Sequence, residues 1–183
     1  MNPTRSSCCF GFLTVRRNEA VGYFGGLLTV NAVGRPLEFH CSLPLKPTRA
    51  QTILYGASLN DFLVGEQIAL ALVSKVKTPP RLLLCDLASA LTLRNVHPAP
   101  LAALVDSPQS AAAGLERPDS PEREDLYRFK LAGHAVATLA GYREDQRAIE
   151  AAWAELAPQV DPREPFSRIV EALMEANPAA KAA

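Results

Sequence analysis

Four side chains of this sequence are candidates for chemistry, and two of them lie close together. Glu38 and His40 occur in the segment LEFHC, and residues two apart on a strand project from the same face. A carboxylate beside an imidazole can orient the ring or raise its pKa, which makes an acid/base pair possible. The alternative is a solvated outer face, because no third group nearby completes a catalytic set.

The other two candidates are carboxylates separated by a pair of prolines. Glu66 lies in DFLVGEQIALALVSKV, and Asp86 follows the apolar run RLLLC. If they converged, they could hold magnesium or manganese, since hard cations prefer oxygen ligands. The structural alternatives are an exposed helix residue for Glu66 and a turn-capping carboxylate for Asp86.

Motifs of the common enzyme classes are absent from the sequence. It has no GxxxxGK[ST] phosphate loop, no GxGxxG after a strand and no GxSxG nucleophile elbow. Its four cysteines, Cys8, Cys9, Cys41 and Cys85, lack the paired spacing of a zinc site and the density of a disulfide scaffold. We therefore expect reduced thiols and no cofactor.

Composition favours one globular domain. The 183 residues are 48% hydrophobic and 21% charged, and 19 basic residues balance 19 acidic ones. A formal charge of zero argues against a general nucleic-acid binder, and Arg16 with Arg17 is the nearest approach to a basic patch. Neither a signal peptide nor a membrane-spanning run is apparent. We expect a soluble cytoplasmic protein with no membrane partner.

The first part of the chain that must position these side chains is predicted to form three antiparallel strands. Aromatic and β-branched residues predict strands over 9–15, 21–31 and 37–45, with turns over 16–19 and 31–36. Alternation in the third strand predicts Leu37, Phe39 and Cys41 inward and Glu38, His40 and Ser42 outward. Glycines weaken strands, so Gly25 and Gly26 favour a β-bulge over a ligand contact.

Helices and a buried strand follow. Helical periodicity predicts a short helix over 48–55, closed by Gly56, and a longer one over 61–76, capped by Ser58 or Asn60. The apolar run 81–87 predicts a central strand buried on both faces. Residues 88–94 fit either a strand or a helix.

A proline-rich excursion separates this first part, residues 1–94, from the rest of the domain. Residues 95–124 are predicted to be flexible, apart from a possible helical turn over 99–105. Residues 125–176 then complete the same domain with two strands joined at Gly133 and helices over 144–156 and 165–176. The tail 177–183 is expected to fray.

The element order resembles that of ribonuclease H-like proteins: three antiparallel strands, a helix, and a buried strand that ends in an acidic residue. In that family, carboxylates of the first strand, first helix and fourth strand hold two divalent ions, so the resemblance implies Glu66 and Asp86 as ligands. The first strand, CFGFLTV, has no acidic residue where the family places its central aspartate. The resemblance therefore implies a different topology, a non-catalytic relative, or a substitute acid such as Glu38.

The sequence as a whole predicts an α+β domain whose antiparallel sheet is covered by helices from 48–76 and 145–176. We expect a non-catalytic binding or structural module whose partner is another protein, with nucleic acid not expected. The alternative is a metal-dependent nuclease, or a degenerate relative, of ribonuclease H-like fold. The carboxy-terminal helices are either the partner surface or a layer packed on their own sheet.

Overall fold

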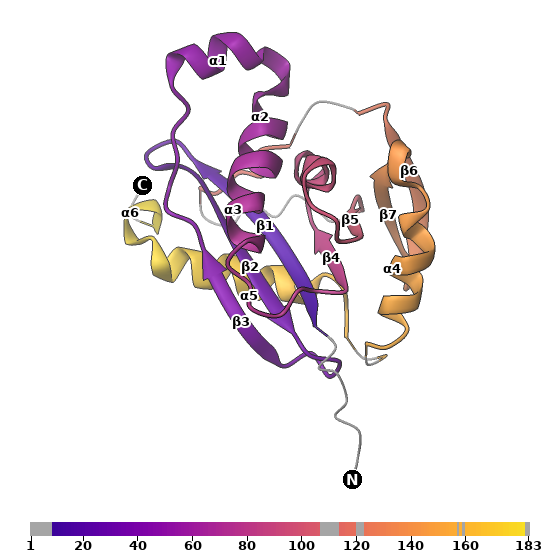
Figure 1. Cartoon of the computed structure of the whole chain (residues 1–183). Helices are drawn as coiled ribbons and strands as arrows, with labels where there is room; N and C mark the ends of the chain where they lie inside the picture. Colours follow the sequence, from indigo (N-terminus) through magenta and orange to yellow (C-terminus); the bar gives the residue numbers. More distant parts are fainter. Residues whose placement is uncertain (1–8, 107–113, 120–122, 157, 159, 182–183) are drawn as a thin grey trace.

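The computed structural model describes residues 9–106, 114–119, 123–156, 158 and 160–181. It contains a seven-stranded mixed sheet with helices on both faces (Figure 1), which confirms the α+β class. The strands lie in the order β3-β2-β1-β4-β5-β7-β6. Their bounds are β1 Phe10–Asn18, β2 Gly22–Val30, β3 Pro36–Cys41, β4 Leu82–Cys85, β5 Leu101–Leu104, β6 Leu126–Leu131 and β7 His134–Leu139.

Helical segments make up most of the remaining described chain. The α-helices are α1 Arg49–Tyr55, α2 Leu59–Asp61, α3 Leu70–Val73, α4 Asp145–Trp153, α5 Glu164–Ala176 and α6 Pro178–Lys181. The other helical segments are η1 Gly56–Ser58, η2 Phe62–Ala69, η3 Ala88–Asn95 and η4 Ala140–Tyr142, of which η2 is a π-helix and the rest are 3₁₀ helices. The undecided segment 88–94 is therefore helical, and the tail expected to fray is helical over α6.

The three antiparallel opening strands are confirmed, but β1 is longer than predicted. It continues through Arg16 and Arg17, and the chain reverses at residues 19–21 instead of 16–19. Arg16 is buried and Arg17 is exposed, because successive strand residues face opposite sides. The two arginines therefore form no common basic patch.

Beyond the predicted antiparallel opening the sheet is mixed, because β4 pairs in parallel with both β1 and β5. β4 is buried throughout, as its apolar run predicted. The predicted helical turn over 99–105 is wrong, since Leu101–Leu104 form β5 between β4 and β7. The residues LAAL are fully buried there, and partners on both sides satisfy their backbone.

Two apolar cores lie on opposite faces of the sheet. One packs beneath η2, α3 and η3 and includes Leu13, Val15 and Ile68. The other packs beneath α4 and α5, where the Phe12 and Phe166 rings meet edge to face at 5.7 Å. The carboxy-terminal helices thus pack on their own sheet, and α5 contacts both β1 and β2.

The glycine pair of β2 serves this two-sided packing, and the predicted bulge at that pair is wrong. Gly25 and Gly26 pair regularly with β1, while the register shift in β2 lies between Thr29 and Val30. A Cβ at Gly25 would lie 2.7 Å from Ile68 Cγ2, and one at Gly26 would lie 2.6 Å from Ile169 Cγ2. The missing side chains let η2 and α5 approach the strand closely.

The predicted helix pair is present, but the predicted cap is wrong. Thr48 and Gln51 form a capping box at the start of α1, and Gly56 closes it with a positive φ of 51°. The Ser58 hydroxyl instead donates to the Tyr55 carbonyl, and Asn60 accepts from the Tyr23 hydroxyl. Helical backbone runs on from η1 into α2, so no free helix start remains to be capped.

The excursion over 95–124 is only partly a surface loop. Beyond β5, residues Gly114–Asp119, which we call the capping segment, return to the sheet and pair Glu116 with Arg17 of β1. Leu115 and Pro118 are buried. Residues 107–113 and 120–122, on which much of the predicted flexibility falls, lie outside the described residues. None of the described helices is long and apolar enough to cross a membrane.

Candidate functional site

A buried ion pair joins the ends of the two central parallel strands. The Arg16 Nη2 of β1 lies 2.6 Å from Asp86 Oδ2, and the Thr14 hydroxyl donates to Asp86 Oδ1 at 2.6 Å. Arg16 Nη1 also donates to the Val15 carbonyl at 3.0 Å. Arg16 and Asp86 are 5% and 3% exposed. Burial of this kind requires each charge to be neutralised by its partner.

Local sequence explains why these groups meet. Leu13 pairs with Cys85 across the β1–β4 ladder, so the next residues, Thr14 and Asp86, come side by side. Thr14 and Arg16 alternate with Leu13 and Val15, which belong to the core beneath η2. They therefore point to the other face, towards the layer of α4 and α5.

The capping segment closes this ion pair off from solvent. The backbone amides of Arg17 and Glu116 each donate to the other residue's carbonyl at 2.8 Å, where β4 has already ended. The Arg117 guanidinium donates to the Asp86 carbonyl at 2.9 Å. The capping segment thus takes the place of a neighbouring strand beside the end of β1.

The predicted carboxylates Glu66 and Asp86 are not brought together. Glu66 is carried by η2, which covers the opposite face of the sheet from the Arg16–Asp86 pair. Among the described residues, no group of three or more His, Cys, Asp or Glu side chains could hold a metal ion. Both Asp86 oxygens are already engaged by Arg16 and Thr14.

Glu38 and His40 do lie together, as their spacing predicted. His40 Nε2 is 3.1 Å from Glu38 Oε2, on the edge strand β3. The Lys77 amide donates to both Glu38 oxygens and the Thr78 amide donates to Oε1, so Glu38 also holds the loop that follows α3. The predicted alternation is only partly present here, because Leu37 and Phe39 are exposed on this edge while Cys41 packs against the core.

The hydrogen bonds to Glu38 have a pH consequence. His40 first, and then the two amides, hold the pKa of Glu38 below its ordinary value. A depressed carboxyl pKa contributes stability above the unfolded pKa, and that contribution is lost as the pH falls through the folded value. The group is solvent-screened, so the contribution is small. The pair has the character of a loop anchor.

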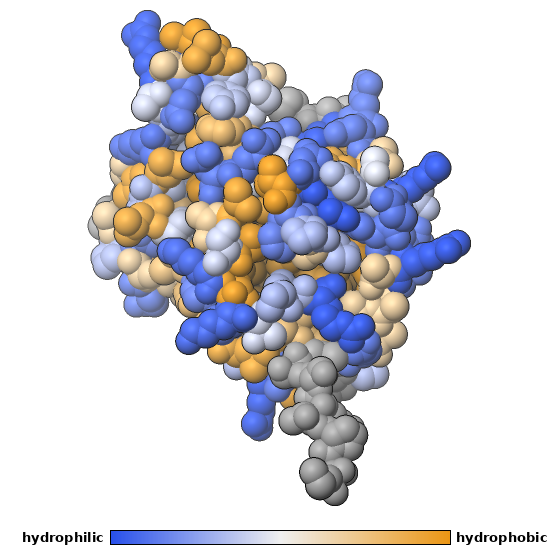
Figure 2. All heavy atoms as spheres, in the orientation of Figure 1, coloured by the Kyte–Doolittle hydropathy of each residue, from blue (hydrophilic) through white to orange (hydrophobic). Residues whose placement is uncertain are grey.

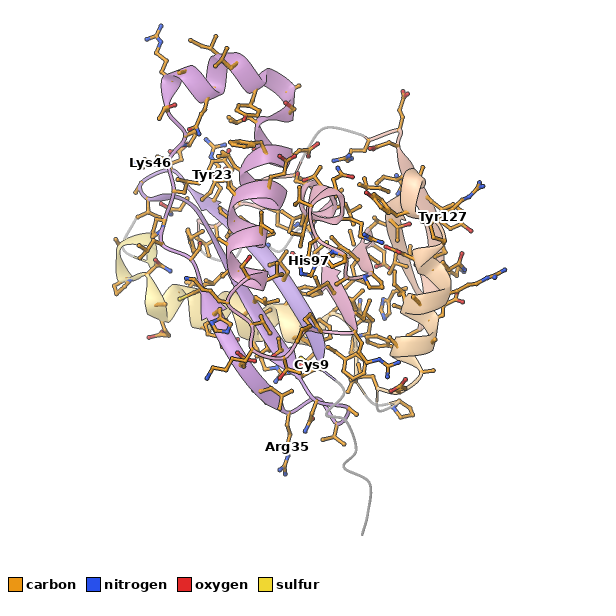
Figure 3. All side chains as sticks on the ribbon, viewed as in Figure 1. Cys9, Tyr23, Arg35, Lys46, His97 and Tyr127 are labelled. Carbon is orange, nitrogen blue, oxygen red and sulfur yellow. The ribbon has the colours of Figure 1, made fainter. Side chains whose placement is uncertain are left out.

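Cys9 and Cys85 are buried, Cys41 is half-buried, and His97 binds a backbone amide. Cys9, Cys41 and Cys85 are free, and burial raises the pKa of Cys9 and Cys85 above the ordinary thiol value. Thiols in this state are poor nucleophiles. The Ala99 amide donates to His97 Nδ1, and burial lowers the pKa of His97. Figure 3 shows His97 near the middle of the molecule and Cys9 at the start of β1.

A different part of the chain carries apolar side chains that are exposed to solvent. We call residues 42–59, which leave β3 and return to α2, the arm, and Figure 1 shows its helix α1 projecting from the body. Helix α1 has no buried residue. The apolar residues exposed on the arm include Leu43 at 88%, Leu54 at 83% and Ile53 at 69%.

The arm is rooted firmly in the domain. Tyr23 and Leu45 exchange two backbone hydrogen bonds of 2.8 and 2.7 Å, and the Tyr55 ring stacks on Phe62 with centroids 4.0 Å apart. Lys46 lies near Tyr23 at this base (Figure 3). Apolar and hydrophilic side chains mix at the tip of the molecule in Figure 2. The chain thus presents to solvent a helix that carries exposed apolar side chains at Ile53 and Leu54.

The sequence pointed to Asp86, but not to Thr14 and Arg16, which bind it, and not to the arm. Thr14, Arg16 and Asn18 share the face of β1 that also carries Phe10 and Phe12, and this shared face is the signal that could have placed Arg16 inside. In α1 the apolar residues Ile53, Leu54 and Tyr55 form one run at the end of the helix, and no second apolar turn accompanies them. Comparison with known proteins adds no assignment, since no family model, curated protein or solved structure matches the chain.

Proposed function

We propose that this chain is a non-catalytic binding module whose arm docks on another protein. The observation that carries the proposal is that α1, a helix with its own capping box, buries none of its side chains. Isolated helices of seven residues are marginal in water, so an ordered one with exposed Ile53 and Leu54 favours a partner that covers it. Exposed apolar patches commonly mark protein interfaces.

The arrangement of the carboxylates supports a non-catalytic role. A two-metal site needs convergent ionised acids, and Asp86 is instead neutralised by Arg16 on the strand that would supply the central acid. Glu66 comes from the layer on the opposite face. We further propose that the module acts in the cytoplasm, which agrees with the free thiols of Cys9, Cys41 and Cys85.

The arm proposal predicts a loss of binding without a loss of folding. Replacing Ile53 and Leu54 together by serine should change the free energy of unfolding by less than about 0.5 kcal/mol, because neither side chain packs in a core. The same variant should fail to retain a protein that the unmodified chain captures from a lysate of its source cells. Retention of every captured protein by the serine variant would contradict the proposal.

A matched control comes from the far side of the sheet. Arg143→Ser with Arg147→Ser changes two exposed residues, one just before α4 and one in its first turn, and should leave both stability and capture unchanged. Loss of capture in this control as well would show that the retained protein binds elsewhere.

The alternative nuclease function predicts a response to divalent ions. For a binding module, millimolar magnesium or manganese should leave the melting temperature unchanged, and the chain should not cleave single- or double-stranded nucleic acid. Glu66→Gln should also be silent, since surface substitutions usually change stability by less than about 0.5 kcal/mol. A metal-dependent rise in melting temperature and cleavage, both abolished in Glu66→Gln, would make the nuclease function the better one.

A further inference from the structure

We propose that a pocket at the root of the arm binds an organic phosphate monoester, with the phosphate group between Arg17 and Lys46. This ligand is bound in addition to the protein that covers the arm, because Ile53 and Leu54 do not line the pocket. The pocket has a volume of about 400 Å³, within the roughly 300–1,000 Å³ of small-molecule sites. Its walls include Arg17, Glu19, Lys46, Pro47, Thr52 and Leu59, and we call it the root pocket.

Backbone pairing brings the two cations of the root pocket together. Arg17 of β1 pairs with Tyr23 of β2, and Tyr23 pairs in turn with Leu45 at the start of the arm. Lys46 therefore follows directly on the row that begins with Arg17, and Figure 3 shows it beside Tyr23 at the base of the arm. Gly22 permits this approach, because a Cβ there would lie 2.5 Å from the Leu45 carbonyl oxygen and 2.8 Å from Lys46 Cγ.

Both cations keep hydrogen-bond donors for a ligand. The Arg17 guanidinium lies over the Tyr23 ring, 5.7 Å from its centroid, and its Nη1 is 3.9 Å from Glu116 Oε2. That distance is too long for a hydrogen bond, and both side chains are exposed, so the ion pair with Glu116 is weak. Within the described chain, neither the Arg17 nor the Lys46 side chain donates a hydrogen bond to another residue. A guanidinium fork together with an ammonium suits a phosphate dianion.

The other walls of the root pocket suit the organic part of such a ligand. Pro47 and Leu59 are half-buried and offer apolar contact. The Thr52 hydroxyl donates to the Thr48 carbonyl at 3.1 Å and can still accept a hydrogen bond. Among the lining residues the two bases outnumber the acid Glu19, whose carboxylate accepts from a ligand hydroxyl and disfavours a second anionic group. Free phosphate would leave these contacts unused.

Titrations followed by nitrogen-15 NMR test the root pocket with two probes, inorganic phosphate and phenyl phosphate, at constant pH and ionic strength. With both probes we expect saturable shifts in the amide signals of residues 17–23 and 45–52. Phenyl phosphate should bind about tenfold more tightly than inorganic phosphate, because its ring packs on Pro47 and Leu59. Arg17→Gln combined with Lys46→Gln should weaken the binding of phenyl phosphate by about tenfold or more, since it removes both charged donors. The dispersion of the same spectra shows whether this variant is folded.

Two controls accompany the titrations. Lys46→Arg keeps the positive charge and should bind phenyl phosphate within about threefold of the unmodified chain. Arg143→Gln with Arg147→Gln removes two exposed cations elsewhere and should leave the shifts at the root pocket unchanged.

Three results would overturn the inference: no saturable shift at residues 17–23 and 45–52, equal affinities for the two probes, or undiminished binding by the glutamine variant. The root pocket and the docking of the arm can fail separately. Ile53→Ser with Leu54→Ser changes the arm outside the pocket and should bind phenyl phosphate like the unmodified chain. Its loss of lysate capture would support the docking of the arm whether or not phosphate binds.

Discussion

Asp86→Asn is expected to destabilise the domain severely. The substitution leaves the Arg16 guanidinium buried without its carboxylate, and breaking one side of a buried ion pair costs roughly 3–5 kcal/mol. For a domain of this size such a loss lowers the melting temperature by about 10 °C. Chemical denaturation monitored by circular dichroism measures the change directly. The expectation differs from that for an exposed strand-end carboxylate, whose removal would be nearly silent.

Two comparisons separate the buried charge from other effects. Glu155→Gln removes a carboxylate from the exposed pair with Arg81, and exposed pairs contribute about 0–1 kcal/mol. Arg16→Met combined with Asp86→Leu removes both buried charges and should recover most of the stability lost in Asp86→Asn, because an apolar pair of similar volume is often as stable. If the double variant were less stable than Asp86→Asn, the Arg16–Asp86 ion pair would contribute more than the mutual neutralisation of its two charges.

Gly65→Ala is the second substitution with a large expected effect. A Cβ there would overlap the Thr92 hydroxyl and approach the Leu93 amide nitrogen to 3.0 Å and the Ser89 carbonyl to 3.1 Å. Overpacking of this kind costs about 1–3 kcal/mol, which exceeds the ~1 kcal/mol that alanine gains over glycine in a helix. We expect a net loss of stability, measured by the same denaturation.

The matched control is Gly141→Ala, because nothing lies within 4 Å of a Cβ at that position and its φ is not positive. It should be neutral or slightly stabilising, since alanine loses less backbone entropy on folding. Thr92→Ala in the Gly65→Ala background should recover only part of the loss. The Thr92 hydroxyl donates at 2.9 Å to the carbonyl of Asp61, the residue before the π-helix, and that bond disappears with the clash. Full recovery would show that the close approaches of the new Cβ to the Leu93 nitrogen and the Ser89 carbonyl cost no stability.

Short-range patterns predicted much of the fold. The hairpin of β6 and β7, the capped helix α1 and the buried strand β4 follow from residue type and spacing over ten residues or fewer. The failures concern partners far apart in sequence. The residues LAAL form a strand only because β4 and β7 lie on either side of them, and Gly25 and Gly26 are explained only by two helices that come later in the chain.

The buried site consists of Thr14, Arg16 and Asp86, and only Asp86 could be predicted from the sequence. Asp86 could be identified as a carboxylate at the end of a buried strand, but its ionic partner lies 70 residues earlier. Arg16 begins the polar run RRNE, whose residue types predict a turn, and only the β1–β4 register places it beside Asp86. Glu38 and His40 needed no long-range information, since their contact depends on strand period alone.

The position of α5 also determines when the domain can be completed during synthesis. The strands β1 and β2 leave the ribosome early, yet Phe166, Ile169 and Leu173, which cover one of their faces, are made more than 130 residues later than β2 ends. Domains generally fold as units, and apolar surface left open in the meantime favours aggregation. A nascent chain that stops short of residue 164 therefore carries an uncovered apolar sheet face, and the fold becomes self-sufficient only when its last long helix has emerged.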